Sequence, residues 1–110
     1  MLLAAGTGTY RHGADFEERL EDLDRVPDAL RWIVETLTGL GYRSGSAGAQ
    51  QYLLNPGLQQ LREAVRAAAA AAPVVVVYYT GHGLKREEDP YYLITAETRP
   101  DRVRRHSGWA

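Results

Sequence analysis

The chain has 110 residues, of which 45% are hydrophobic and 25% charged, and its formal net charge is −1. These values predict one small globular domain rather than a disordered chain. The near-neutral charge argues against a protein that coats nucleic acid or an anionic membrane. The sequence has no cysteine, which excludes disulfides, cysteine-ligated zinc and a cysteine nucleophile within these residues.

Targeting signals are also missing from the sequence. No apolar run is long enough to cross a membrane, and the first residues lack the basic start and long apolar core of a signal peptide. We therefore expect a cytoplasmic protein. Arginine accounts for all but one of the 13 basic residues, and alanine is abundant, a bias typical of high-GC bacterial genes.

The first predicted element is a short buried strand at residues 2–5, which are all apolar and run into the glycine-rich residues 6–10. Residues 11–24 are polar and mostly charged. Their few apolar side chains have helical spacing, so this segment is either a short helical turn or a solvated loop with apolar anchors: Phe16, Leu20 and Leu23.

Two helices are predicted next. The first covers residues 27–38, because Pro27 suits a first helical turn and the apolar residues recur at helical spacing before Gly39 and Gly41. Residues 42–47 are a weak second strand. Asn55 and Pro56 predict the start of the second helix, with Asn55 as its cap, and the helix continues to residue 72 before Pro73.

Residues 74–79 are six β-branched or aromatic side chains in a row. A run that is apolar on both faces is typical of a central parallel strand, so we expect this strand to be buried on both faces. Residues 80–83 interrupt it, residues 91–95 form a short later strand, and the polar tail from residue 99 shows no periodicity.

The order strand, helix, strand, helix, strand predicts a parallel sheet with helices on its faces. Ligands bind such sheets beyond the carboxyl ends of the strands, where the strand order reverses. If the second and third strands flank the first, that point lies between the loops at residues 6–10 and 80–84.

His82 is the main candidate for chemistry in these loops. It lies between Gly81 and Gly83, which permit a tight turn that leaves the imidazole uncovered. Histidine is a general acid or base near neutral pH, and the N–H of Gly83 would suit a developing oxyanion. The alternative is a loop histidine with no role.

Residues 74–83 closely resemble the catalytic-histidine strand of the caspase and metacaspase family, in which an apolar strand, an aromatic pair and a small residue precede Gly-His-Gly. Residues 3–10 are similar to the family's first strand and its glycine-rich exit. Residues 23–42 resemble its next segment, in which an aspartate opens a helix that ends in Leu-Gly-Tyr. Residues 91–95 resemble the strand after the histidine, so the resemblance covers nearly the whole chain.

The resemblance implies a three-layer α/β/α sandwich with a mainly parallel sheet, and a cysteine endopeptidase that hydrolyses peptide bonds. His82 would be the general base and acid, and Gly83 part of the oxyanion site. No cofactor is implied by the Cys–His dyad, although calcium activates some metacaspases. The family's cysteine lies on the next parallel strand, so residues 1–110 resemble only the N-terminal, large-subunit-like part of the domain, truncated before the nucleophile. Three explanations fit the missing cysteine: the chain is a fragment, a second chain supplies the rest of the domain, or the protein is a degenerate form.

The resemblance also implies a substrate-binding role for Asp28. In metacaspase-like proteins an aspartate at this position lines the pocket for a basic P1 side chain, the residue before the cleaved bond. A carboxylate suits arginine or lysine there. Three alternatives stay open: an ordinary acid in a first helical turn, a pocket built on Asp24, and an acidic P1 held by Arg11 as in true caspases.

Other signals are weaker. Residues 6–8 resemble a phosphate loop, but the following lysine and the dinucleotide spacing are missing. The three histidines, His12, His82 and His106, lack metal-ligand spacing, so we expect no metal. The pair His106 and Ser107 is a poor nucleophile arrangement, and the arginines at 102, 104 and 105 form either a solvated stretch or a basic docking patch.

The expected partners are a peptide or protein substrate and the missing C-terminal half or associated effector domains. Neither nucleic acid nor a membrane is expected. The rival interpretation is a non-catalytic pseudopeptidase or adaptor that acts by protein–protein interaction. A generic α/β ligand-binding domain is a third, favoured only if the histidine loop is buried.

Overall fold

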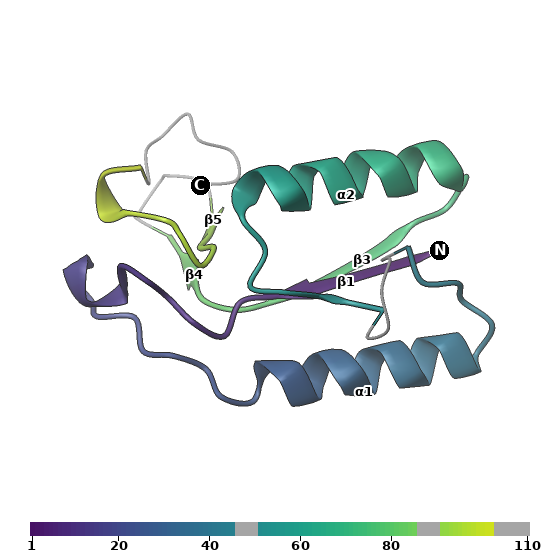
Figure 1. The fold of residues 1–110 in the computed structure, drawn as a ribbon, viewed down its shortest axis with the longest axis horizontal. Helices are drawn as coiled ribbons and strands as arrows, with labels where there is room; N and C mark the ends of the chain where they lie inside the picture. The colour runs from purple at the N-terminus through teal and green to yellow at the C-terminus, as the bar shows by residue number, and fades with distance from the viewer. Residues whose placement is uncertain (46–50, 86–90, 103–110) are drawn as a thin grey trace.

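The computed structural model describes residues 1–45, 51–85 and 91–102. A three-stranded parallel sheet lies between two helices, and a two-stranded antiparallel ribbon lies beyond one end of it (Figure 1). The elements in chain order are β1 (Leu2–Gly6), a 3-10 turn (Gly13–Asp15), α1 (Val26–Gly39), β2 (Leu53–Leu54), α2 (Leu58–Ala71), β3 (Val76–Thr80), β4 (Gly83–Leu84), β5 (Tyr92–Leu93) and a 3-10 turn (Pro100–Arg102).

β1 is the centre of the fold. It pairs in parallel with β2 on one side and with β3 on the other, and all five of its residues are buried. Leu2 and Ala4 pack against α1, whereas their neighbours point to the opposite face, where α2 lies in Figure 1. The alternation of side chains along a strand therefore lets one short apolar run supply both faces of the core.

Helix α1 confirms the prediction for residues 27–38. Pro27 lies in its first turn, where a backbone N–H would have no acceptor within the helix, so the helix loses no hydrogen bond to proline. Val26, Leu30 and Val34 form the buried stripe. The chain leaves the helix through Gly41, whose φ of +102° suits a residue without a Cβ.

Helix α2 confirms the second predicted helix but not its predicted start. It begins at Leu58 with Gly57 as the N-terminal cap, and it buries Leu61 and Ala68 against the sheet. The prediction that Asn55 caps this helix is wrong. Asn55 adopts a φ of +53° and uses its side chain elsewhere, as described below.

The second strand lies elsewhere than predicted. Of the described part of residues 42–47, Ser44 alone bridges Leu2, and residues 46 and 47 lie outside the described residues. The paired strand is β2, where Leu53 and Leu54 lie beside Ala5 and Gly6. A two-residue strand is too short to leave an alternating pattern in the sequence.

The prediction that residues 74–79 form a central strand buried on both faces is also wrong. β3 lies at one side of the sheet, in the order β2-β1-β3, and none of its residues is fully buried. Val77 is 48% exposed and Val74, just before the strand, is 67% exposed. The strand and its parallel pairing are confirmed, but its side chains are as exposed as those of a strand at the edge of a sheet.

A second core lies beyond the carboxyl ends of the strands. Tyr10, Phe16, Tyr92 and Ile94 form it, and Leu20, Leu23 and Leu84 pack around it. For residues 11–24 this supports the loop with apolar anchors, with only one 3-10 turn at Gly13–Asp15. The predicted strand at residues 91–95 is present as β5, which pairs antiparallel with β4 and not with the main sheet.

Neither helix in the described ranges is both long and apolar enough to cross a membrane.

Candidate functional site

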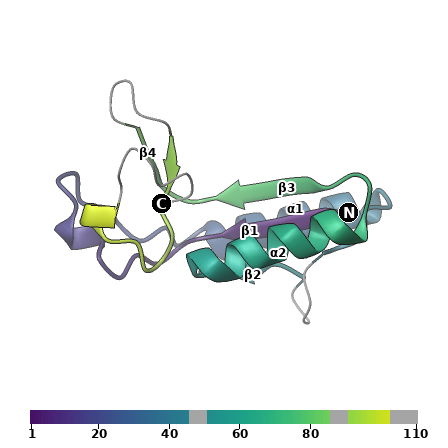
Figure 2. The same ribbon diagram turned by 90° about the horizontal axis from the view of Figure 1, so that it is seen from above.

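The carboxyl ends of the three parallel strands meet at one edge of the sheet. Gly6 lies beside Leu54 of β2 and beside Thr80 of β3, so the three exit loops start side by side. Figure 2 shows β3 running along β1 and leading on towards β4 beyond this edge. The strand order is the one that the switch-point argument requires, and it brings residues 7–10 next to Gly81 and His82.

His82 lies at this edge, as predicted, and is half-buried. Its Nε2 atom is 2.8 Å from the backbone carbonyl oxygen of Glu21. A carbonyl oxygen only accepts hydrogen bonds, so Nε2 carries the proton in this contact. In the neutral imidazole Nδ1 is then the basic nitrogen.

The backbone of His82 is held on both sides. Its N–H donates to the hydroxyl of Tyr10 at 2.6 Å, and its carbonyl oxygen accepts from the N–H of Ile94 at 3.1 Å. The Tyr10 ring also lies against the imidazole, with centroids 4.8 Å apart and planes inclined by 56°. Such tilted aromatic contacts are favourable, so ring and backbone of His82 are fixed together.

Tyr10 is itself anchored. Its hydroxyl donates to the carbonyl oxygen of Thr7 at 3.0 Å, its N–H donates to Asp22 Oδ1 at 3.0 Å, and its side chain is buried in the second core. Burial raises the pKa of Tyr10 to about 12, against the hydrogen bond from His82, which lowers it. The phenol is therefore neutral at physiological pH.

A second, half-buried tyrosine ties β3 to the same loops. The hydroxyl of Tyr79 lies 2.6 Å from Thr7 Oγ1 and donates to the carbonyl oxygen of Ile94 at 3.1 Å. Burial raises the pKa of Tyr79 as well. The two tyrosines join the exits of β1 and β3 to β5 through neutral hydrogen bonds.

The glycines beside His82 have different functions. A Cβ on Gly81 would lie 2.9 Å from the Tyr10 hydroxyl and 3.3 Å from the Thr7 carbonyl oxygen, so this position requires close approach. Gly83 belongs to β4, pairs with Leu93 and is exposed, with the ring of Tyr91 against it. The oxyanion role of the Gly83 N–H remains a prediction.

Asn55 closes the exit loop of β1 from the β2 side. Its Oδ1 atom accepts hydrogen bonds from the N–H groups of Gly8 and Thr9 at 2.8 and 3.1 Å. Asparagine is among the few residues that tolerate a positive φ, and here this conformation aims the amide at the loop. Asn55, predicted to cap a helix, instead caps the N–H groups of the β1 exit loop.

Asp28 lies in the first turn of α1, whose start lies at the same edge, because Val26 contacts Gly6 and Gly8. Its exposed carboxylate pairs with Arg31 at 3.6 Å. No contact with His82 is found within the described residues. The pocket role of Asp28 remains a prediction.

The two alternatives to Asp28 are also exposed. Asp24 lies in the loop just before α1. Arg11 pairs with Glu97 at 3.3 Å. Since both side chains reach solvent, their positions do not decide which of the three would meet a substrate.

Of the other two histidines, His12 pairs with a neighbouring acid and His106 lies outside the described residues. Nδ1 of His12 is 3.7 Å from Asp15 Oδ2 in the 3-10 turn. No group of three or more potential metal-ligating side chains is found in the described ranges. Residues 104–107 are not described.

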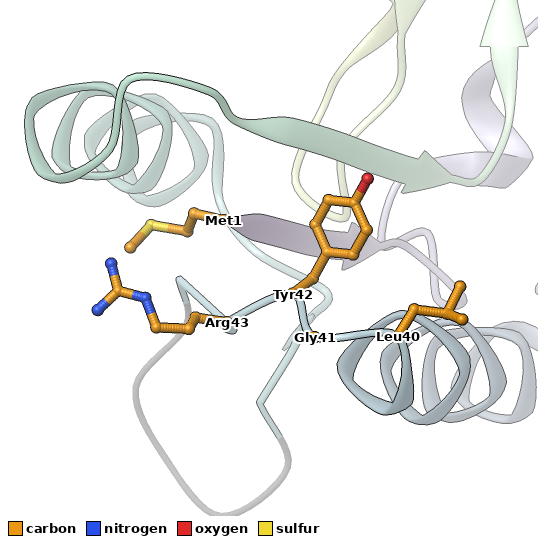
Figure 3. A pocket seen from close by; sticks show the side chains of 5 residues that line it. All are labelled: Met1, Leu40, Gly41, Tyr42 and Arg43. Atoms are coloured by element: carbon orange, nitrogen blue, oxygen red, sulfur yellow. The ribbon is translucent and has the colours of Figure 1, made fainter.

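A hollow of about 320 Å³ opens at the other end of the sheet, next to the amino end of β1 (Figure 3). Its lining residues come from the chain start and the exit of α1: Met1, Leu40, Gly41, Tyr42 and Arg43. None of these lining side chains is a carboxylate, an imidazole, a thiol or an aliphatic hydroxyl. The candidate site is therefore the carboxyl edge and not this hollow.

Sequence reasoning missed Tyr10 and Glu21. Tyr10 belongs to the glycine-rich exit loop that the switch-point argument singled out, so the loop was a usable signal. Glu21 acts through its backbone carbonyl, which every residue type offers, so no side-chain pattern reveals it.

Comparison of the chain with family models, with curated proteins and with solved structures finds no match.

Proposed function

We propose that this chain is the histidine-bearing part of a caspase-like cysteine endopeptidase with a three-layer α/β/α arrangement. The observation that carries the proposal is His82 at the carboxyl edge of the sheet, with Nε2 held by the Glu21 carbonyl and Nδ1 left as the base. The motif that ends in Gly-His-Gly supports it. The nucleophilic cysteine would come from residues outside this chain.

The first half of the reaction, in which the cysteine is acylated, requires two proton transfers at His82. Its Nδ1 atom accepts the proton of the thiol, and the resulting thiolate attacks the carbonyl carbon of the peptide bond. The imidazolium then gives its proton to the departing amine as the C–N bond breaks, which leaves a thioester that water hydrolyses to restore the thiol. Glu21 stabilises the imidazolium, because its carbonyl dipole accepts from Nε2–H throughout.

The substrate class follows from Asp28. We propose that its carboxylate binds a basic P1 side chain, since it is exposed and lies at the helix start on the same edge. Arg31 occupies the carboxylate in the absence of substrate. Asp28→Asn should therefore weaken cleavage after arginine and lysine through KM more than through kcat.

The test uses the longest natural protein that contains these residues, assayed with peptide reporters that carry arginine or lysine at P1. We expect turnover by that protein and none by residues 1–110. His82→Ala should lower kcat by about 10²–10⁴-fold, the usual worth of general acid–base catalysis. His12→Ala is the matched control, since His12 lies just before the 3-10 turn, pairs with Asp15 and should leave kcat unchanged when replaced. Full activity of the His82 variant would contradict the proposal.

A non-catalytic pseudopeptidase or adaptor is the second candidate, favoured by the absence of cysteine from all 110 residues. The same experiment separates the two. If the longest natural protein contains no cysteine on a following strand and cleaves none of the reporters, the adaptor function is preferred.

A further inference from the structure

We propose that Tyr10 is a positioning residue that holds the imidazole of His82 in its working orientation. The inference rests on the proposed function of His82 and deepens it. Tyr10 contacts His82 in two independent ways, through its hydroxyl and through its ring, and no sequence motif assigns it this role.

The first contact fixes the backbone of His82. The Tyr10 hydroxyl accepts from the His82 N–H at 2.6 Å and donates to the Thr7 carbonyl oxygen at 3.0 Å. One oxygen atom therefore ties the start of the histidine loop to the exit of β1. Phenylalanine would fill the same space but leave the His82 N–H without this acceptor.

The second contact fixes the side chain. The imidazole is held between the ring of Tyr10, 4.8 Å away, and the carbonyl oxygen of Glu21, 2.8 Å from Nε2. A histidine side chain has two rotatable bonds, so a ring contact and a hydrogen bond at its tip define both. Loss of the ring contact leaves only the hydrogen bond to resist rotation.

Tyr10 is suited to this role because it is rigid and stays neutral. Its ring is buried among Phe16, Tyr92 and Ile94, and its backbone N–H is bound by Asp22. A neutral hydroxyl donates and accepts at once, which the bridge between His82 and Thr7 requires. A charged side chain at this buried place would be costly.

The experiment compares Tyr10→Phe with Tyr79→Phe by NMR of residues 1–110. Tyr79 is the matched control, because its half-buried hydroxyl belongs to the same network but bonds Thr7 and Ile94 instead of His82. In Tyr10→Phe, which keeps the ring, we expect the His82 amide proton to exchange at least tenfold faster. In Tyr10→Leu, which also removes the ring contact, we expect the Nε2–H signal to broaden. In Tyr79→Phe both signals should stay as in the unmodified protein.

Several results would overturn the inference. One is that Tyr10→Phe lowers Tm as Tyr79→Phe does while the His82 signals stay unchanged. Tyr10 would then stabilise the fold without positioning His82. If Tyr10→Phe does not fold, the unmodified protein decides: it must show a slow His82 amide and nuclear Overhauser contacts between the Tyr10 and His82 ring protons. Absence of both overturns the inference.

A kinetic readout separates this inference from the proposed function. In a longer protein that cleaves reporters, Tyr10→Phe should lower kcat about tenfold with little change in KM. Unchanged kcat together with unchanged NMR signals overturns the positioning role. If His82→Ala leaves cleavage intact while the NMR signals respond to Tyr10→Phe, the proposed function fails and the structural coupling of Tyr10 to His82 stands.

Discussion

Tyr10 buries a phenol group against His82, and Tyr79, three positions before His82 in the chain, half-buries a second; neither hydroxyl pairs with a charge. Both hydroxyls bond to backbone or neutral partners, so the links that these two phenols make involve no ionised group. Such bonds do not depend on salt, and those that the phenols donate hold only while the phenols keep their protons.

The pH dependence of stability follows from the raised pKa of Tyr10. Below pH 10, its ordinary pKa, both the folded and the unfolded chain keep the proton, so this group does not change stability there. Between pH 10 and about 12 the unfolded chain releases the proton that the folded chain retains, and stability falls. In urea unfolding at pH 9, 10 and 11, the free energy of unfolding should fall more steeply with pH in the unmodified protein than in Tyr10→Phe. Equal slopes would show that Tyr10 ionises freely in the folded state.

At the scale of elements, the three strand exits are held together by backbone hydrogen bonds and by side chains that reach across from other loops. Asn55, at the end of β2, binds two N–H groups of the β1 exit, and Tyr10 binds the β3 exit. β2 itself contributes two paired residues. The Asn55 amide therefore adds two hydrogen bonds to a short ladder of backbone bonds between β1 and β2.

Replacement of Asn55 tests this dependence. Asn55→Gly keeps the positive φ at no cost but removes the acceptor of Gly8 and Thr9, and should lower the free energy of unfolding by about 1–3 kcal/mol. Asn55→Asp keeps an acceptor oxygen and should stay within about 1 kcal/mol of the unmodified protein. Denaturant unfolding of both variants measures the difference. A destabilisation by aspartate as large as that by glycine would contradict the capping role.

The same elements show what a sequence reveals. The helices were predictable, because their apolar spacing and their Pro and Gly signals are local. β2 was not, because two residues carry no period, and Asn55 was misplaced because Asn-Pro is equally typical of a helix start. His82 was predictable from its glycine neighbours at a strand end. Its hydrogen bond to Tyr10 joins residues 72 positions apart, which no local pattern encodes.

At the scale of the whole molecule, the position of β3 was the main error. An unbroken apolar run indicates that both faces of a strand avoid water, but sheet order also depends on which strands pair. β3 pairs with β1 along one edge, and no other strand in the described ranges pairs with it. A flat apolar edge without charge or proline favours association between chains.

Charge placed on that edge should improve solubility. Val77→Lys puts a lysine on a half-exposed position of β3, whereas Val74→Lys adds the same charge just before the strand. Either change moves the net charge from −1 towards zero, which by itself favours association. We expect only Val77→Lys to reduce the weight-average mass at high concentration in sedimentation velocity. An equal effect of the two variants would assign the association to another surface.

The central strand is synthesised before either of its partners. Leu2 pairs with Val76 and Gly6 with Thr80, so β1 has no partner on the β3 side until the chain has grown past residue 80. At a translation rate of roughly 5–20 residues per second, that interval lasts several seconds. Throughout it, the apolar residues of β1 lack this partner. Ribosome-associated chaperones should therefore bind β1 during translation and release it once β3 has emerged.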